Sequence, residues 1–135
     1  MSSEVEVRWR QRLTNFGRAC ALLAEIDGYP VEVTPEIVRE GFVQRFEIAF
    51  DLAWKPLSDY LEHEGIAVRP TPRAVIKEAY QARVIGDGQL FMDMLETRNE
   101  MSHRYDEAAF DQAFLKIRDS YAAALAALCQ RLEQS

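Results

Sequence analysis

Residues 34–61 read TPEIVREGFVQRFEIAFDLAWKPLSDYL, and this stretch determines the fold. It opens as a helix should, with Thr34 as N-cap, Pro35 at the first helical position and an acid near the positive end of the helix dipole. Its apolar side chains recur every four residues in two rows, which are Val38, Phe42, Phe46, Phe50, Trp54 and Ala49, Ala53, Leu57, Leu61. A helix that is apolar on most sides belongs in the middle of a bundle. We expect a kink at Pro56 and an end at Gly65.

The rest of the chain also shows helical periodicity. We expect a first helix over residues 4–26, a short helix over residues 71–84 with Thr71 as its cap, and two further helices capped by Asp87 and Asp106. Strand-like alternation is absent from the sequence. These features predict an all-α protein, an antiparallel, up-and-down four-helix bundle with one additional short helix, in a single domain spanning residues 1–135.

Composition narrows the class of protein. The formal net charge of −6 argues against the broad basic face of a nonspecific nucleic-acid-binding protein. No apolar run approaches the roughly 20 residues that span a bilayer, and the first residues are charged rather than signal-like. We therefore expect a cytoplasmic protein without membrane contact. Cys20 and Cys129 lie in apolar helical surroundings, and we expect buried free thiols, with a disulfide between them as the less favoured alternative.

Polar side chains appear in residues 98–105, RNEMSHRY, where helical rows predict apolar ones. Two rows of this helix begin apolar and turn polar, namely Leu90, Met94, Arg98, Ser102 and Phe91, Leu95, Asn99, His103. Burying an unpaired guanidinium is costly. We therefore expect Arg98, Asn99, Ser102 and His103 on the inward face of the helix, at a functional site or at an interface that needs them.

These side chains suit chemistry on a phosphodiester. An imidazole can move a proton to or from a ribose hydroxyl, and a guanidinium can hold the non-bridging oxygens. Because RNA supplies its own 2′-hydroxyl as nucleophile, no metal or other cofactor is required, and no metal-ligand spacing occurs in the sequence. Simpler roles stay open for these residues. Arg98 can form an ion pair with Glu47 or Asp51, and Tyr105 can be a packing residue. His103 can be a residue of the helix C-terminus that the helix dipole favours there.

The spacing of Arg98, His103 and Tyr105 matches the R-x4-H-x-Y motif of HEPN domains. The surrounding sequence resembles the HepT-like proteins, also called nucleotidyltransferase substrate-binding proteins. Residues 46–55, 72–80 and 92–99 resemble, in the same order, that family's second helix, short helix and approach to the motif. The resemblance covers roughly residues 5–130. Glu100 departs from it, because a small or apolar residue is expected there.

The resemblance implies a metal-independent endoribonuclease toxin, with tRNA among its candidate substrates, that works without a cofactor. Arg98 would hold the phosphate, His103 would be the general acid and base, and Asn99 and Ser102 would support them. A separate minimal nucleotidyltransferase would be the antitoxin-like partner and would adenylylate Tyr105. The alternative is a non-catalytic subunit that presents a nucleotide or an acceptor to that nucleotidyltransferase.

A homodimer is expected on the same grounds. One arginine and one histidine make a small active site, and two copies related by a two-fold axis would double the positive field in one cleft. We therefore expect the helices that carry Arg98 to lie near that axis.

Overall fold

The computed structural model of the chain describes residues 3–135, and α2 (Glu36–His63) is its central helix. α2 contacts each of the other α-helices. Its buried side chains include most members of the two predicted rows, namely Phe42, Phe46, Ala49, Phe50, Ala53, Leu57 and Leu61. Burial of these side chains supplies the apolar core, so the central position predicted for this helix is confirmed.

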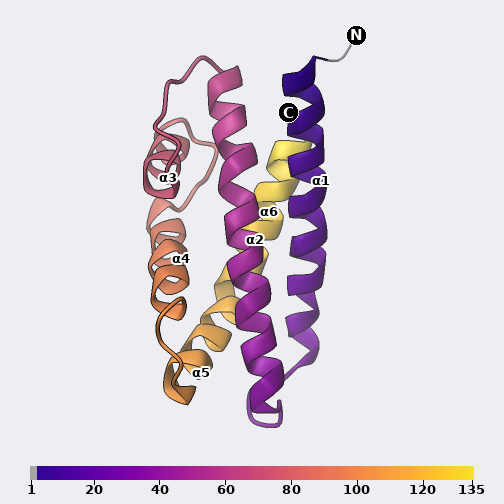
Figure 1. Cartoon of the computed structure of the whole chain (residues 1–135), viewed down its shortest axis with the longest axis vertical. Coiled ribbons are helices and arrows are strands. Elements are labelled where there is room, and N and C mark those ends of the chain that lie inside the picture. The colour runs from indigo at the N-terminus through magenta and orange to yellow at the C-terminus, as the bar shows by residue number, and fades with distance from the viewer. Residues whose placement is uncertain (1–2) are drawn as a thin grey trace.

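The two sides of α2 are covered differently. α1 (Glu4–Ala24), which continues into a short 3-10 segment, η1 (Glu25–Gly28), runs along one side of α2. On the other side α3 (Pro72–Gln81) and α4 (Gly88–Met101) follow one another along the length of the bundle, as Figure 1 shows. The short predicted helix therefore shares one side of the bundle with α4.

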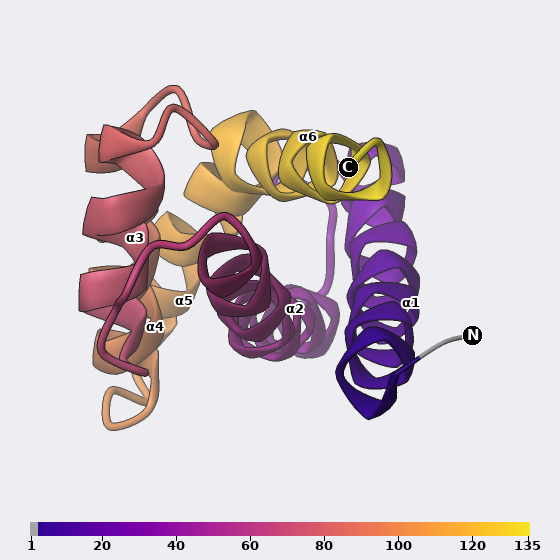
Figure 2. The same ribbon diagram turned by 90° about the horizontal axis from the view of Figure 1, so that it is seen from above.

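The chain then returns along the bundle in one long helical stretch. This stretch consists of α5 (Glu107–Lys116), a π-helical turn, η2 (Ile117–Tyr121), and α6 (Ala122–Glu133). Viewed from above in Figure 2, α6 lies across from α2 and next to α1. Residues 3–135 contain no strand, and the predicted all-α bundle with one additional short helix is confirmed. None of the helices in that range is long and apolar enough to span a membrane.

Three predicted helix caps are present. Each accepts a hydrogen bond from the backbone amide three residues later, at 3.3 Å for Thr71, 3.0 Å for Asp87 and 2.8 Å for Asp106. Gly65, at φ +80°, follows the end of α2, where the amide of Ile66 donates to the carbonyl of Leu61 at 2.9 Å. This pattern closes a helix through a left-handed residue that favours glycine.

The predicted cap at Thr34 is wrong. α2 begins at Glu36, its N-cap position is Pro35, and no side chain caps it. The Thr34 hydroxyl is buried and donates to the carbonyl of Pro30 instead. The hydroxyl closes the preceding turn, so it is not available to the first amides of the helix.

The π turn in the middle of the last helical stretch was not expected from the sequence. It carries Tyr121, whose hydroxyl lies 3.0 Å from the hydroxyl of Thr97 on α4. The Tyr121 ring stacks on Phe46 with 5.1 Å between ring centroids. Both Thr97 and Tyr121 are almost fully buried, so this pair links α4 to the last helical stretch inside the core.

Cys20 and Cys129 are both buried and free, as predicted. Burial raises the pKa of Cys20 to about 12 and that of Cys129 to about 11, with Cys129 and Glu133 adding to the rise at Cys20. Thiols with such pKa values carry little thiolate at neutral pH and are unreactive.

Candidate functional site

The R-x4-H-x-Y residues lie where α4 ends and the chain turns into α5, at the lower end of the bundle in Figure 1. Arg98 is in the last turn of α4, whereas His103 and Tyr105 are in the connection that follows it. The backbone amide of His103 donates to the carbonyl of Glu100 at 3.2 Å, and the Tyr105 hydroxyl donates to the carbonyl of Ser102 at 3.2 Å. Local hydrogen bonds therefore shape this loop.

The expectation of an inward face is wrong for Asn99, Ser102 and His103, whereas Arg98 does point toward α2. Asn99, Ser102 and His103 are exposed and Arg98 is half-buried. The buried positions near this end of α4 are Met94, Leu95, Thr97 and Met101. The reason is geometric: each four-residue step along an α-helix turns about 40° past a full revolution, so a row that starts over the core drifts off it within two steps.

Arg98 is held by a carboxylate on α2. Its Nε donates to Asp51 Oδ1 and its Nη2 donates to Asp51 Oδ2, each at 3.0 Å. The side chains are 33% and 45% exposed, so water reaches this two-pronged ion pair. Of the ion pairs that the sequence left open, the one with Asp51 is confirmed. The hydrogen bonds that Arg98 donates to Asp51 raise the pKa of Arg98 further.

Glu47 lies one turn before Asp51 and is also affected by this pair. Burial raises the pKa of Glu47, Arg98 opposes that rise, and the neighbouring charge of Asp51 adds to it. Two carboxylates from α2 thus share one arginine from α4, and the hydrogen-bonded one is Asp51.

A groove of about 320 Å³ lies between α2 and α4 beside this pair. Its floor is apolar, and its polar and aromatic lining comes from Asp51, Trp54, Lys55, Arg98 and Asn99. Pro72, the first residue of α3, is also part of the lining. We call this the α2–α4 groove; its size is at the lower end of the range for small-molecule sites.

The α2–α4 groove combines two cationic side chains, Lys55 and Arg98, with the aromatic ring of Trp54. Lys55 is exposed and Trp54 is half-buried, so both are available to a ligand. The Arg98 fork matches the geometry of a phosphate as well as that of a carboxylate. From the sequence, a core position was favoured for Trp54 over a base-stacking role. The structure packs Trp54 against the core and also places it in the groove lining.

His103 and Tyr105 are not part of the groove lining. Tyr105 is 81% exposed, and its only side-chain hydrogen bond in the described chain is the one to Ser102. The structure therefore brings Arg98 and Asn99 to the groove and leaves His103, Ser102 and Tyr105 on the adjacent loop, open to solvent.

The charge of Glu100 is balanced within this loop. Glu100 and Asp106 both form ion pairs with Arg104. The hydrogen bonds to Asp106 and Glu100 raise the pKa of Arg104. The bond from the Ala109 amide and the contact with Arg104 lower the pKa of Asp106. The departure from the family pattern at Glu100 thus comes with its own cationic partner.

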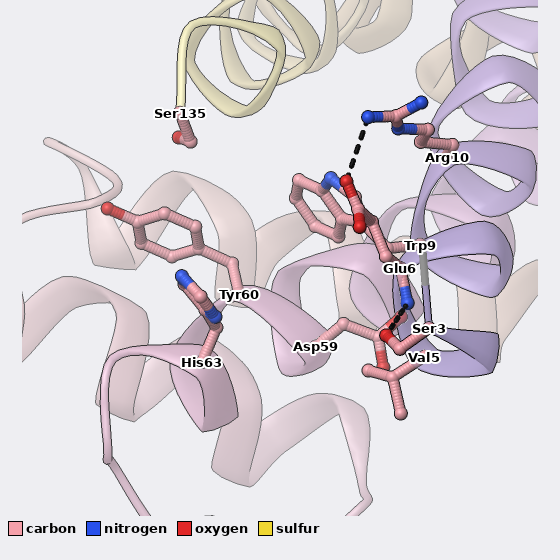
Figure 3. Close-up of a pocket in the computed structure, with 9 residues that line it drawn as sticks. All are labelled: Ser3, Val5, Glu6, Trp9, Arg10, Asp59, Tyr60, His63 and Ser135. Carbon is pink, nitrogen blue, oxygen red and sulfur yellow. Dashed lines mark hydrogen bonds and ion pairs between the residues drawn. The ribbon is translucent and has the colours of Figure 1, made fainter. Parts of the chain in front are cut away.

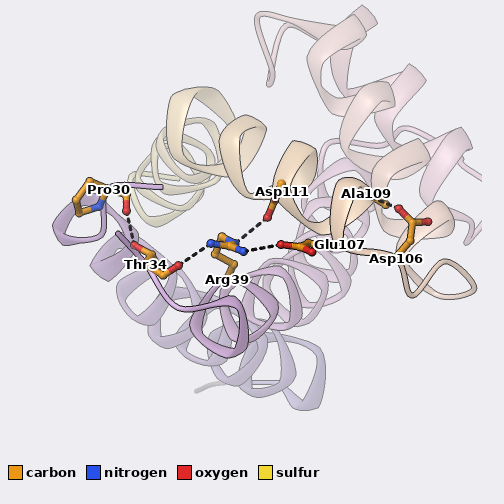
Figure 4. Close-up of polar contacts among 7 residues, drawn as sticks. All are labelled: Pro30, Thr34, Arg39, Asp106, Glu107, Ala109 and Asp111. Carbon is orange, nitrogen blue, oxygen red and sulfur yellow. Dashed lines mark hydrogen bonds and ion pairs between the residues drawn. The ribbon is translucent and has the colours of Figure 1, made fainter. Parts of the chain in front are cut away.

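A half-buried arginine fixes the start of α5, which follows the loop. Arg39 on α2 donates to the carbonyl of Thr34 at 2.6 Å and lies 3.5 Å from Glu107 (Figure 4). Its Nε is 2.7 Å from Asp111 Oδ1, an ion contact whose angle is not that of a hydrogen bond. These contacts tie α5 to α2 and so set where the motif loop must end.

Metal-ligating side chains do not gather at this site. Within residues 3–135, no three His, Cys, Asp or Glu side chains lie close enough together to hold a metal ion.

Comparisons with known proteins place the chain in a family. The sequence profile described as "nucleotidyltransferase substrate binding protein like" matches residues 11–134. A protein of Thermus thermophilus known from its crystal structure is similar, with 27% sequence identity and a TM-score of 0.72 over 88% of this chain and 96% of that one. No curated protein matches the sequence. The chain therefore belongs to the nucleotidyltransferase substrate binding protein like family.

Proposed function

We propose that this protein is a non-catalytic subunit that binds a nucleotide, or another phosphate-bearing substrate, for a nucleotidyltransferase. The observation that carries the proposal is the match of the family to residues 11–134, nearly the whole chain. The α2–α4 groove supports it, because it offers a cationic fork, a second cation and an aromatic wall in one place.

In this proposal the ligand phosphate takes over the guanidinium fork of Arg98. Asp51 is the competitor for that fork, and its carboxylate is accessible enough to swing into water when a phosphate arrives. Lys55, one turn along α2 from Asp51, supplies a second positive charge as a flexible point contact. The half-buried indole of Trp54 gives a surface on which a base can stack.

The test uses the two tryptophans of the chain, Trp9 and Trp54. Only Trp54 lines the groove, so the Trp9→Phe variant reports on this site alone through its fluorescence. We expect saturable quenching by AMP, and affinity at least tenfold weaker after Arg98→Ala, the loss expected for one charge-assisted phosphate contact.

Arg12→Ala is the matched control for that variant. Arg12 also pairs with a carboxylate of α2, since both oxygens of Asp59 lie 2.8 Å from its Nη1, but Arg12 lies outside the groove. Equal affinities for AMP in the Arg98→Ala and Arg12→Ala proteins would remove Arg98 as the phosphate ligand.

A second candidate is a metal-independent endoribonuclease, favoured by the intact R-x4-H-x-Y spacing and by the exposure of His103 and Tyr105. In that case Arg98 would have to leave Asp51 to hold the scissile phosphate, while His103 moved the proton of the 2′-hydroxyl. A second copy of the chain across a two-fold axis would add another arginine and histidine to the cleft.

This candidate is tested by incubating the purified protein with tRNA in the presence of EDTA. Cleavage that disappears in both the Arg98→Ala and His103→Ala variants would favour the ribonuclease. Absence of cleavage, or cleavage that both variants retain, would leave the binding subunit as the function. The mass of the protein in solution tests the homodimer separately.

A further inference from the structure

A second cavity lies at the end of the bundle opposite to the motif loop. It has a volume of about 400 Å³ and lies where α1 begins and where α2 and α6 end (Figures 1 and 3). Its lining includes Glu6 and Trp9 from α1 and Asp59, Tyr60 and His63 from α2. The proposed function makes no use of these residues, so the cavity needs its own account.

Two half-buried aromatic rings form one wall of this cavity. The rings of Trp9 and Tyr60 have centroids 6.5 Å apart and planes tilted by 33°. Tyr60 is also held by Arg131 on α6, whose guanidinium lies 5.5 Å from the ring centroid and whose Nη2 donates to the Tyr60 hydroxyl at 3.4 Å. The wall is therefore fixed before any ligand arrives, which lowers the entropic cost of binding.

The rest of the lining is polar apart from Val5, and it carries no excess of positive charge. Asp59 accepts both of its hydrogen bonds from Arg12, and Glu6 accepts one from Arg10 at 2.8 Å. A carboxylate oxygen has two lone pairs, so each of these groups can still accept a hydrogen bond from a ligand. The exposed imidazole of His63 stands beside Tyr60 in Figure 3 and can donate or accept.

We propose that this cavity binds the purine base of a nucleoside. A planar heteroaromatic ring suits the Trp9–Tyr60 wall, and the N–H groups on its edge suit the carboxylates of Asp59 and Glu6. A hydrocarbon ring would leave those carboxylates without compensation for lost water. A phosphate is not the recognised group, because two carboxylates, Glu6 and Asp59, line the cavity with only one arginine, Arg10. The volume is in the range of small-ligand sites.

The experiment follows the fluorescence of Trp9 in the Trp54→Phe variant during titration with adenosine. We expect saturable quenching and a dissociation constant at least tenfold higher after Tyr60→Ala, since loss of one stacking partner commonly costs this much. His63→Ala, a change at an exposed position, should weaken binding severalfold without affecting folding. Tyr60→Phe keeps the ring, so its dissociation constant for adenosine should be within about threefold of that of the protein with Tyr60.

Three results with the Trp54→Phe protein would overturn the proposal. The first is the absence of a saturable response of Trp9 to adenosine. The second is an equal response to adenosine and to uridine, whose ring is smaller. The third is binding that is unchanged in both the Tyr60→Ala and the His63→Ala proteins. Adenosine quenching seen only in the Trp9→Phe protein would also overturn it, because that signal comes from the α2–α4 groove. Failure of AMP binding in that groove leaves this inference untouched.

Discussion

Replacing Asp51 with asparagine should increase the affinity of the α2–α4 groove for AMP. Asp51 occupies both prongs of the Arg98 guanidinium, with two hydrogen bonds of 3.0 Å, and therefore competes directly with a phosphate. Asparagine has nearly the same shape but carries no charge. The variant thus removes the competitor while leaving Arg98, Trp54 and Lys55 in place.

The size of the effect follows from two contributions. An ion pair exposed to this extent contributes about 0.5–1 kcal/mol to stability. In the Asp51→Asn variant this ion pair is absent, so phosphate binding no longer has to break it. Removing the carboxylate also removes about 1 kcal/mol of repulsion toward a phosphate roughly 4 Å away in water. Together these give about 1.5–2 kcal/mol, or roughly tenfold to thirtyfold tighter binding. The loss of the ion pair should lower the free energy of unfolding by no more than about 1 kcal/mol.

The assay is equilibrium quenching of Trp54 by AMP in the Trp9→Phe background. Glu25→Gln is the matched control, because Glu25 pairs with Arg45 at 3.3 Å at similar exposure and lines neither the groove nor the second cavity. We expect the gain with Asp51→Asn only, and we expect it to shrink as salt screens the site. Unchanged or weaker AMP binding by Asp51→Asn would refute the argument that Arg98 is the phosphate ligand.

Three further predictions concern stability and reactivity. Burial raises the pKa of Glu47 above its ordinary value of 4.5, so the ionised side chain destabilises the folded protein. Glu47→Gln should therefore raise the urea midpoint of unfolding at pH 7. This gain in stability should vanish as the pH falls below about 4.5, where Glu47 is protonated in the unfolded protein as well. An advantage that persisted at low pH would contradict this cause. Burial raises the pKa of Cys20 to about 12 and that of Cys129 to about 11. Both thiols should resist a thiol reagent at pH 8 in the native protein and should react in urea. Rapid reaction of the native protein would contradict their burial. Thr97→Val and Tyr121→Phe should each lower the free energy of unfolding by about 1–2 kcal/mol, because each change leaves a buried hydroxyl unpaired. The double variant should lose about 1 kcal/mol less than the sum of the two single losses. Strict additivity in urea unfolding would count against the 3.0 Å bond.

The fold follows closely from local sequence signals. The apolar rows of residues 34–61 predict a central helix because burial on most sides is possible only there. Caps at Thr71, Asp87 and Asp106 were predictable because each bonds an amide three residues away. Thr34 has the same sequence pattern, but a competing bond to Pro30 uses its hydroxyl.

The site follows less completely, because it depends on contacts between helices. The motif spacing identified Arg98, but the pairing with Asp51 joins residues 47 positions apart, and Glu47 was an equal candidate from the sequence. Residue spacing also could not show that His103 stays on the loop, since the direction of a side chain past the end of a helix is set by the turn that follows. The place of Trp54 at the groove depends on how α4 packs against α2.

We propose that this chain serves a nucleotidyltransferase through the groove at Arg98. The most direct measurement is co-expression and co-purification of this chain with a minimal nucleotidyltransferase, followed by nucleotide transfer by the complex. We expect a stable complex with either wild-type protein or Arg98→Ala, and transfer that is slower by at least tenfold with Arg98→Ala. Absence of a complex, together with EDTA-resistant cleavage of RNA by this chain alone, would contradict the account.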